Sequence, residues 1–509
     1  MMRVQSRFGL VATLVGLALL PAVSPASAQQ FESIASFAGC PAAGCAPDDD
    51  AARPTAIVVG PDGHFYGIGG LDWRDGEDTA RDWGTIFRQR ADGTREILHR
   101  FDGTGRTGCG TLRISFGPDG ALYGVGLSCY GYEGTAIFRL QDTSFQILQE
   151  FPPGEFVPRW MVAGSNGAFY GLAAAIVSGF QRDVLFKWDG AVTPLGAYQG
   201  TAPADLVLAP DGNLYFATRR EHSVIELFDG FIYRLTSGDQ IQVVYTFSAS
   251  SGGQSAPADD LIVGSDGFLY GTRLWRYAGG RGPDLYKMTL SGQVLFNRPE
   301  SQGVPPLEAA PDGSVFLAMD FGASIARLTP AAAVVPIHAF PDGLNTLIRL
   351  VRGPDGHYYG VRAHGGDDGL GTFFRIRMPS VDVKANGGDD PVSVTAGTPL
   401  QISLAFDASA TEVLSPSEVY FAVVTPALQI IWTTPSGFSL TPSPLYSGPL
   451  PSFPSTALIT IPDAAVLPPG DYYWVAIVDA DANGVPNGHY VDFVKTTKMS
   501  AATALQRKR

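Results

Sequence analysis

The chain has 509 residues, too many for one hydrophobic core, so two or more domains are expected. It contains 35 Lys and Arg residues and 49 Asp and Glu residues, which gives a formal net charge of −14. This acidic balance argues against nucleic acid and against anionic membrane surfaces as partners. The seven His residues show no paired spacing, so a zinc site is not expected.

The first predicted element is a secretory signal peptide at residues 1–28. Arg3 and Arg7 form a basic start, an apolar run extends from Phe8 to Leu20, and Ala26-Ser27-Ala28 forms a small-residue cleavage site. A retained membrane anchor is the alternative, but the run is short and is followed by prolines. The protein is therefore expected to be secreted or periplasmic, with no membrane span.

The predicted export bears on the four cysteines, because exported proteins commonly contain disulfides. Cys40, Cys45, Cys109 and Cys129 are even in number and lack a CxxC metal spacing, so they are expected to form disulfides. The pairing stays open, although nearness in the sequence favours Cys40–Cys45 with Cys109–Cys129.

A phrase of about ten residues recurs along residues 58–360 and predicts a repeated β-hairpin. In each copy an apolar stretch leads to a tight turn, usually Asp-Gly, and an aromatic stretch follows. Gly accepts positive φ there, and Asp or Asn bonds the local backbone. The seven copies are VVGPDGHFYG (58–67), SFGPDGALYG (115–124), VAGSNGAFYG (162–171), VLAPDGNLYF (207–216), IVGSDGFLYG (262–271), EAAPDGSVFL (308–317) and VRGPDGHYYG (351–360).

Each hairpin is followed by a third strand, such as GTIFRQ (84–89), and usually by a fourth that ends in an aromatic residue, such as EILHRF (96–101). Four short strands in roughly 45–55 residues is the period of a β-propeller blade. The seventh unit stops after GTFFRI (371–376), and QFESIASFAG (30–39) matches the missing fourth strand. The N-terminal strand is therefore expected to complete the last blade, close the ring and cover a sheet edge.

These motifs carry a family resemblance. The phrase G-x-DG-x-LYG, a Gly-rich loop and the element G-T-x-F-R/K-L make residues 31–378 similar to the GloVer-type tandem repeat of exported bacterial proteins described as choice-of-anchor. The resemblance implies a β-propeller and export, and it brings no catalytic residue. The phrase also resembles lactonase-like and NHL-like propellers, a likeness that implies metal ligands among acids and amides around the channel.

From about Val381 the periodicity changes to short alternating strands, such as EVYFAVVTP (418–426) and GDYYWVAIVDAD (470–481), with Pro and Gly turns. This pattern predicts an immunoglobulin-like β-sandwich without its disulfide. The expected fold class is all-β, a seven-bladed β-propeller closed by the N-terminal strand and followed by this sandwich. The expected domains are the propeller at 29–379, the sandwich at 380–498 and a tail at 499–509.

One set of candidate binding residues lies in the loops between second and third strands, which should share one face of the propeller, the loop face. Aromatic residues stand there among charges, a mixture suited to stacking on sugar rings. The alternative is that these rings pack on neighbouring loops. The candidates are Trp73, Trp83, Trp275 and Tyr277.

A second set stands seven residues before each turn glycine, where the innermost strand of each blade begins. These residues should form the rim of the central channel. Two carboxylates there could serve as acid and base or hold a cation, and the arginines could bind an anionic group. The alternative is that the charges pair or stay hydrated. The set is Ala56, Arg113, Trp160, Asp205, Asp260, Pro306 and Arg349.

Calcium is the one cofactor that the sequence leaves open. Asp479, Asp481 and Asn483 have the spacing of a calcium loop, but Tyr490 stands where such a loop wants Glu. A hairpin turn with local side-chain hydrogen bonds is therefore favoured over a metal site.

The favoured function is that of an exported, non-catalytic binding or scaffold protein that recognises a glycan or a protein through its loop face. One alternative is an enzyme that acts from the channel mouth on a polysaccharide or lactone-type substrate with Asp205 and Asp260. Another is a structural component of the cell surface or matrix. The oligomeric state and the identity of the ligand stay open.

Overall fold

The structure is a computed structural model. It describes residues 13–14, 31–37, 53–69, 84–102, 110–127, 134–154, 156–177, 180–196, 198–200, 203, 205–222, 227–247, 254–264, 266–277, 280–299, 306–310, 314–319, 323–328, 334–340, 347–378, 380–389, 391–407, 414–450, 452–479, 484–486 and 490–500. The chain divides into two compact units. One is Phe31–Ile376, and the other comprises Met1–Gln30 and Arg377–Arg509.

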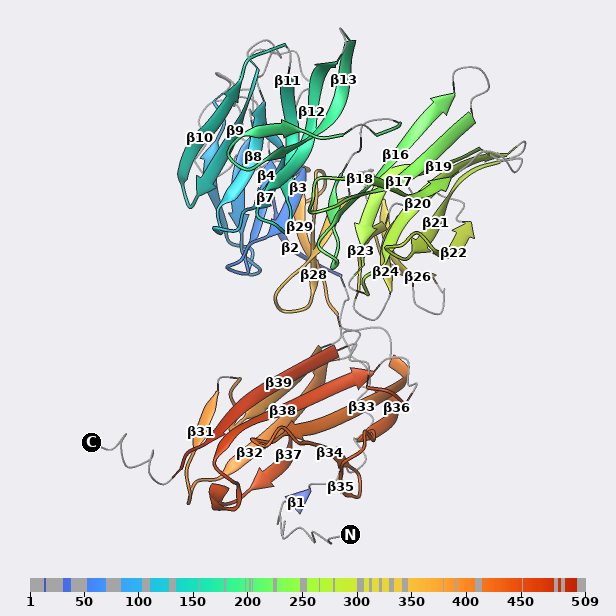
Figure 1. Cartoon of the computed structure of the whole chain (residues 1–509). Coiled ribbons are helices and arrows are strands. Elements are labelled where there is room, and N and C mark those ends of the chain that lie inside the picture. The colour runs from blue at the N-terminus through green and yellow to red at the C-terminus, as the bar shows by residue number, and fades with distance from the viewer. Residues whose placement is uncertain are drawn as a thin grey trace. The chain divides into compact units, whose positions relative to one another are not determined.

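The first unit is a propeller-like series of four-stranded antiparallel sheets that follow one another in chain order (Figure 1). Sheet 1 consists of β3 (Ala56–Val59), β4 (Phe65–Gly69), β5 (Thr85–Gln89) and β6 (Arg95–Arg100). Sheet 2 consists of β7 (Thr111–Phe116), β8 (Leu122–Leu127), β9 (Thr135–Gln141) and β10 (Ser144–Phe151). Sheet 3 consists of β11 (Phe156–Ala163), β12 (Phe169–Val177), β13 (Phe180–Trp188) and β14 (Val192–Pro194). Sheet 4 consists of β15 (Val207–Leu208), β16 (Leu214–His222), β17 (Leu227–Leu235) and β18 (Ile241–Phe247).

The remaining sheets of this unit continue the same pattern. Sheet 5 consists of β19 (Gln254–Val263), β20 (Leu269–Tyr277), β21 (Gly280–Met288) and β22 (Val294–Pro299). Sheet 6 consists of β23 (Pro306–Ala309), β24 (Val315–Met319), β25 (Ser324–Leu328) and β26 (Val334–Ala339). Sheet 7 consists of β27 (Leu347–Arg352), β28 (Tyr358–Arg362), β29 (Thr372–Ile376) and, from the start of the unit, β2 (Phe31–Ser36).

The pairing of β2 with β29 confirms that the early strand completes the last sheet. The two strands are antiparallel, with Phe31 opposite Ile376 and Ser36 opposite Thr372. At one end, the Phe31 ring stacks on His338 of sheet 6 with ring centres 3.7 Å apart. At the other end, Arg95 of sheet 1 donates to the Ser36 carbonyl over 3.1 Å. β2 therefore covers the edge of sheet 7 and contacts the sheets on both sides.

The spacing of the repeated phrase follows from its turn. In sheet 2, the Ala121 amide donates to one carboxylate oxygen of Asp119 over 3.2 Å, and the Tyr123 hydroxyl donates to the other over 3.0 Å. Gly120 has φ of +74°, a conformation that suits glycine. The aromatic residue thus stands four positions after Asp because its hydroxyl returns to the turn. Equivalent Asp–Tyr bonds join Asp62 to Tyr66, Asp211 to Tyr215, Asp266 to Tyr270 and Asp355 to Tyr359.

Neighbouring sheets pack face to face through apolar side chains, and the last sheet packs on the first. Successive residues of a strand point to opposite faces, and both faces are covered, so the strands are rich in apolar residues throughout. Ring contacts join Phe316 to Tyr358 and Tyr359 to Phe65. Elsewhere, residues of consecutive sheets belong to the same apolar cluster: Tyr66 and Leu122, Val125 and Phe169, Leu172 and Phe216, Tyr215 and Leu269, Tyr270 and Leu317.

The second unit has two sheets around one core. The smaller sheet has the order β1 (Thr13–Leu14), β37 (Phe453–Ile461), β32 (Leu400–Asp407) and β30 (Ser380–Ala385). The larger has the order β31 (Val392–Val394), β39 (Tyr490–Lys498), β38 (Gly470–Asp479), β33 (Leu414–Val424), β34 (Ile430–Thr434) and β35 (Gly437–Ser439), with β36 (Tyr446–Leu450) paired to β33. A short 3₁₀ helix, η3, covers Ala464–Val466. The shared core includes Leu404 and Phe406 from one sheet and Phe421 and Trp474 from the other.

The predicted disulfides lie where the structure offers no test. Cys40, Cys45, Cys109 and Cys129 all lie outside the described residues. Within the described part, no helix is long and apolar enough to cross a membrane.

Candidate functional site

Three of the predicted rim residues meet on neighbouring sheets. Arg113 lies in β7 of sheet 2, Trp160 in β11 of sheet 3, and Asp205 just before β15 of sheet 4. An Nη1 atom of Arg113 stands 2.9 Å from a carboxylate oxygen of Asp205. The guanidinium carbon of Arg113 lies 5.0 Å from the centre of the Trp160 ring, within range of a cation–π interaction. The ion pair thus joins a residue of sheet 2 to a residue that precedes sheet 4, and its arginine lies beside the tryptophan of sheet 3.

These three residues, which we call the rim cluster, interact with one another as a structural contact does. Besides the arginine, Asp205 accepts a hydrogen bond from the Leu206 amide over 2.8 Å. The side chains of Arg113 and Asp205 are only 27% and 14% exposed. Trp160 is 5% exposed, so its ring offers no open platform for a sugar.

The other rim positions contribute less to a site. Ala56 packs against the apolar cluster between sheets 1 and 2. Asp260 lies in β19, Pro306 in β23 and Arg349 in β27, but their side chains lie outside the described part of the structure. A paired-carboxylate role for Asp205 with Asp260 therefore has no geometric support in the described residues.

The loop face presents an apolar hairpin tip that the sequence analysis did not single out. β12 and β13 are long strands joined at residues 178–179, at the opposite end of sheet 3 from its Asn-Gly turn. Near this junction Phe180 is 69% exposed, Ile176 48% and Val177 40%. The sequence feature that could have indicated this tip is the apolar run AAAIV, which continues past the last buried residue of β12. We refer to these three side chains as the sheet 3 tip.

The aromatic candidates of the loop face have little described structure. Trp73 and Trp83 lie outside the described residues. Trp275 and Tyr277 lie in β20, near its junction with β21, and only their backbone is described. The sequence analysis expected both residues in the loop between the second and third strands. The structure places them in β20 instead, because that strand stays paired with β21 as far as Tyr277. Their role in binding stays a prediction.

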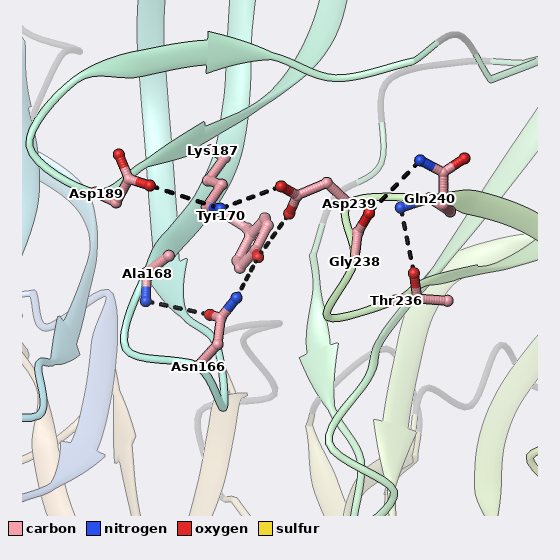
Figure 2. A network of polar contacts seen from close by, with 9 residues as sticks. All are labelled: Asn166, Ala168, Tyr170, Lys187, Asp189, Thr236, Gly238, Asp239 and Gln240. Carbon is pink, nitrogen blue, oxygen red and sulfur yellow. Dashed lines mark hydrogen bonds and ion pairs between the residues drawn. The ribbon is translucent and has the colours of Figure 1, made fainter.

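The turn face, where the repeated turns gather, holds a network that joins sheets 3 and 4 (Figure 2). The third copy of the phrase has Asn166 where most copies have Asp. Its Nδ2 donates to the Tyr170 hydroxyl over 2.8 Å, and that hydroxyl donates to Asp239 over 2.9 Å. Asp239 lies in the turn between β17 and β18 of the next sheet, and Lys187 of β13 also donates to it over 3.1 Å. A carboxylate from the neighbouring sheet thus stands in for the missing one.

The network shifts the titration of its members. Burial raises the pKa of the Tyr170 hydroxyl, and the bond to Asp239 acts in the same direction. The hydrogen bond to Asp239 also raises the pKa of Lys187. Both groups therefore keep their protons at neutral pH. Asp239 was missed from the sequence because its partner lies 69 residues away in another repeat.

A cavity of about 890 Å³ also opens on the turn face, between sheets 7 and 1. It is lined by the two turns that match most closely in sequence, and its charged or titratable lining residues are Asp62, His64 and Arg352. Asp62 is engaged by the Tyr66 hydroxyl and the His64 amide. In the described residues, no three His, Cys, Asp or Glu side chains group in a way that could hold a metal ion.

The proposed calcium loop is only partly described. Asp479 is fully buried at the end of β38, opposite Glu418 of β33. Asp481 and Asn483 lie outside the described residues, so the loop geometry stays a prediction.

The architecture defines an all-β protein with a propeller-like series of four-stranded sheets and a separate two-sheet unit. No protein-family model matches the chain, and no curated protein matches it. Membership of the GloVer-type family therefore stays an expectation.

Several solved structures are similar at low identity, and they are β-propeller-type proteins. A streptogramin B lyase is 15% identical, with 68% of this chain and 96% of that chain covered and a TM-score of 0.44. A catalytically inactive virginiamycin B lyase from Staphylococcus aureus with quinupristin is 14% identical, with 65% and 97% covered and a TM-score of 0.44. The polysaccharide lyase Uly1 is 11% identical, with 67% and 92% covered and a TM-score of 0.39. Likeness at this level concerns the fold, and no function follows from it.

Proposed function

We propose that the protein is an exported, non-catalytic binding protein that recognises its ligand through the loop face of a seven-bladed β-propeller. The seven blades would be the four-stranded sheets of Phe31–Ile376, closed by β2, in the manner of the GloVer-type repeat. The cyclic packing of these sheets supports the closed ring. The second unit would be an immunoglobulin-like adaptor, with residues 1–28 removed as a signal peptide and the domains divided near residue 380.

The observation that carries the binding role is the sheet 3 tip. Three large apolar side chains lie exposed near the end of the β12–β13 hairpin, beyond the buried residues of sheet 3. Packing of the core therefore does not explain their presence. Exposed apolar groups in one place are typical of surfaces that another molecule covers. The side chains of the sheet 3 tip suit an apolar protein surface, whereas the tryptophans predicted for the loop face suit a sugar ring. The partner is therefore a protein or a glycan.

The rim supports a non-catalytic role. An enzyme that worked from the channel mouth would need an acid free to exchange a proton or to hold a cation. Asp205 instead engages Arg113 and the Leu206 amide. This arrangement favours the structural alternative for the rim charges.

The test is a glycan array probed with residues 29–509. The variants would be Trp73→Ala/Trp275→Ala and Phe180→Ser, with Leu428→Ser as the control. Leu428 is 84% exposed in the second unit, so this change also removes an exposed apolar side chain, but from the other unit of the chain. If the ligand is a glycan, we expect the array to identify a glycan that the wild type binds, that the tryptophan variant binds more weakly and that the control binds as well as the wild type.

A protein partner has a different signature. A photoreactive residue placed at position 180 would then cross-link to one discrete exported protein, and the same residue at position 428 would not. If the protein turned over a polysaccharide or a lactone, and Asp205→Ala abolished that turnover, the result would contradict the proposal and support the alternative of an enzyme.

A further inference from the structure

The smaller sheet of the second unit accepts an added strand at one edge. Its order is β1, β37, β32 and β30, so β1 is an outer strand laid on β37. The pairing is antiparallel, with Thr13 opposite Thr460 and Leu14 opposite Ile459. In the described part of the chain, nothing else pairs with that side of β37. The backbone of β37 is therefore aligned for hydrogen bonding to a strand that comes from elsewhere in the sequence.

β37 lacks the charges that usually protect a sheet edge. Its nine residues, FPSTALITI, include no Asp, Glu, Lys or Arg. The opposite edge of the same sheet is β30, SVDVKA, where Lys384 forms an ion pair with Asp382 over 3.0 Å. Natural sheets commonly use charged side chains to prevent unwanted pairing at an edge. One edge of this sheet is protected in this way, and the β37 edge is not.

The strand that occupies this edge comes from the segment that export would remove. β1 lies inside residues 1–28, the proposed signal peptide. Its removal would leave the unpaired N–H and C=O groups of β37 exposed along the Thr460 end. Such an edge can take up an extended peptide by β-strand addition, in which main-chain hydrogen bonds provide the affinity.

We propose that the β37 edge of the mature protein binds an extended, uncharged, apolar segment of a partner polypeptide as an antiparallel strand. The chemistry of the segment follows from its place beside STALITI and from the strand seen there, which belongs to the apolar run VATLVGL. This site is separate from the loop face and concerns a different unit of the chain.

A second copy of the chain fits the edge less well. If two β37 strands paired along their full length in antiparallel register, Pro454 of each would stand opposite Thr460 of the other. Proline has no N–H to donate and is poorly tolerated in a paired ladder. The proline would thus fall where β1 makes its contact, so a separate segment is the better occupant.

The test measures binding of a fluorescent peptide of residues 10–19, LVATLVGLAL with a charged solubilising tail, to residues 29–509. Two further peptides carry a backbone N-methyl group, one at Thr13 and one at Leu14. In a paired strand, neighbouring N–H groups point to opposite sides. One N-methyl peptide should therefore lose roughly tenfold in affinity, and the other should bind within about twofold of the parent. Equal binding of all three peptides, or equal loss in both N-methyl peptides, would overturn the proposal.

A pair of protein variants locates the site. Thr460→Lys places a charge on the edge strand and should weaken peptide binding several-fold. Gln401→Lys is the matched control, because Gln401 of β32 lies directly opposite Thr460, one strand further in. Equal loss in both variants would contradict edge binding, and so would a mature chain that dimerises in sedimentation and ignores the peptide. Because residues 29–509 are made directly, the result does not depend on loop-face binding or on cleavage of the leader, which mass spectrometry of the exported protein measures separately.

Discussion

Tyr170 of sheet 3 donates its hydroxyl hydrogen to Asp239 of sheet 4 over 2.9 Å, and so ties two sheets together at the turn face. In most other copies of the repeat, the equivalent tyrosine bonds to an Asp of its own turn. The third copy has Asn166 in that place, and the carboxylate comes from the neighbouring sheet. The substitution thus converts a contact within one sheet into a contact between two.

Asp239→Ala should lower the free energy of unfolding by about 1–3 kcal/mol, because it removes the acceptor of both Tyr170 and Lys187. The measurement is urea unfolding. Asp142→Ala is the matched control, since Asp142 also has positive φ in the corresponding turn of sheet 2, so both variants carry the same backbone strain. Adding Asn166→Asp to Asp239→Ala should restore part of the loss, and equal effects of the two alanine variants would contradict the role of the Tyr170–Asp239 bond.

The stability of the first unit should decrease in mild acid. His99 stacks on Phe145 of the next sheet with ring centres 3.8 Å apart, and burial lowers the pKa of His99 to about 4. In the unfolded chain His99 has the ordinary pKa of 6.5, so above that pH its titration does not change the stability. As the pH falls from 6.5 to 4, the unfolded chain binds the proton first and stability is lost.

The check is the free energy of unfolding at pH 7 and at pH 5. Replacement His99→Phe keeps an aromatic ring against Phe145 and removes the titration. The variant should therefore lose less stability between the two pH values than the wild type does. His338 contributes a loss in the same direction, because burial lowers its pKa as well. An identical pH dependence in both proteins would refute the assignment to His99.

The repeat and its turn chemistry were predictable because each depends on local sequence. The Asp-Gly turn, the tyrosine four residues later and the match between residues 30–39 and a missing fourth strand all appear in the letters themselves. Asp239 was not predictable, because its bond joins residues of different sheets. The exposure of Phe180 was also hidden, since a strand pattern does not show where the core ends. The pairing of Thr13 with Thr460 depends on a free edge that no local pattern encodes.

The pairing of Arg113 with Asp205 predicts coupled effects on stability and none on ligand binding. Either Arg113→Ala or Asp205→Ala should cost about 1–2 kcal/mol, because each leaves a partly buried charge without its partner. The double variant should cost less than the sum of the two, which a double-mutant cycle in urea measures. Additive costs would show that the two side chains do not interact, and loss of loop-face binding in Asp205→Ala would contradict the structural role of the rim.

Calcium removal should leave the melting temperature unchanged. The turn after β38 has the acidic spacing of a calcium loop but lacks the Glu that would complete it, and a hairpin turn explains the same residues. The measurement is thermal unfolding with and without a chelator, with Asp481→Ala as a companion variant. A chelator-dependent fall in melting temperature that Asp481→Ala abolishes would establish the metal site.

The account depends most on the closure of the first unit by β2, and hydrogen–deuterium exchange of residues 31–36 tests it most directly. If β2 is the outer strand of sheet 7, its hydrogen-bonded amides should exchange far more slowly than those of an unstructured chain, and Phe31→Ser should accelerate them. Exchange of residues 31–36 at the rate of an unstructured chain, with β28 still protected, would contradict the closed ring.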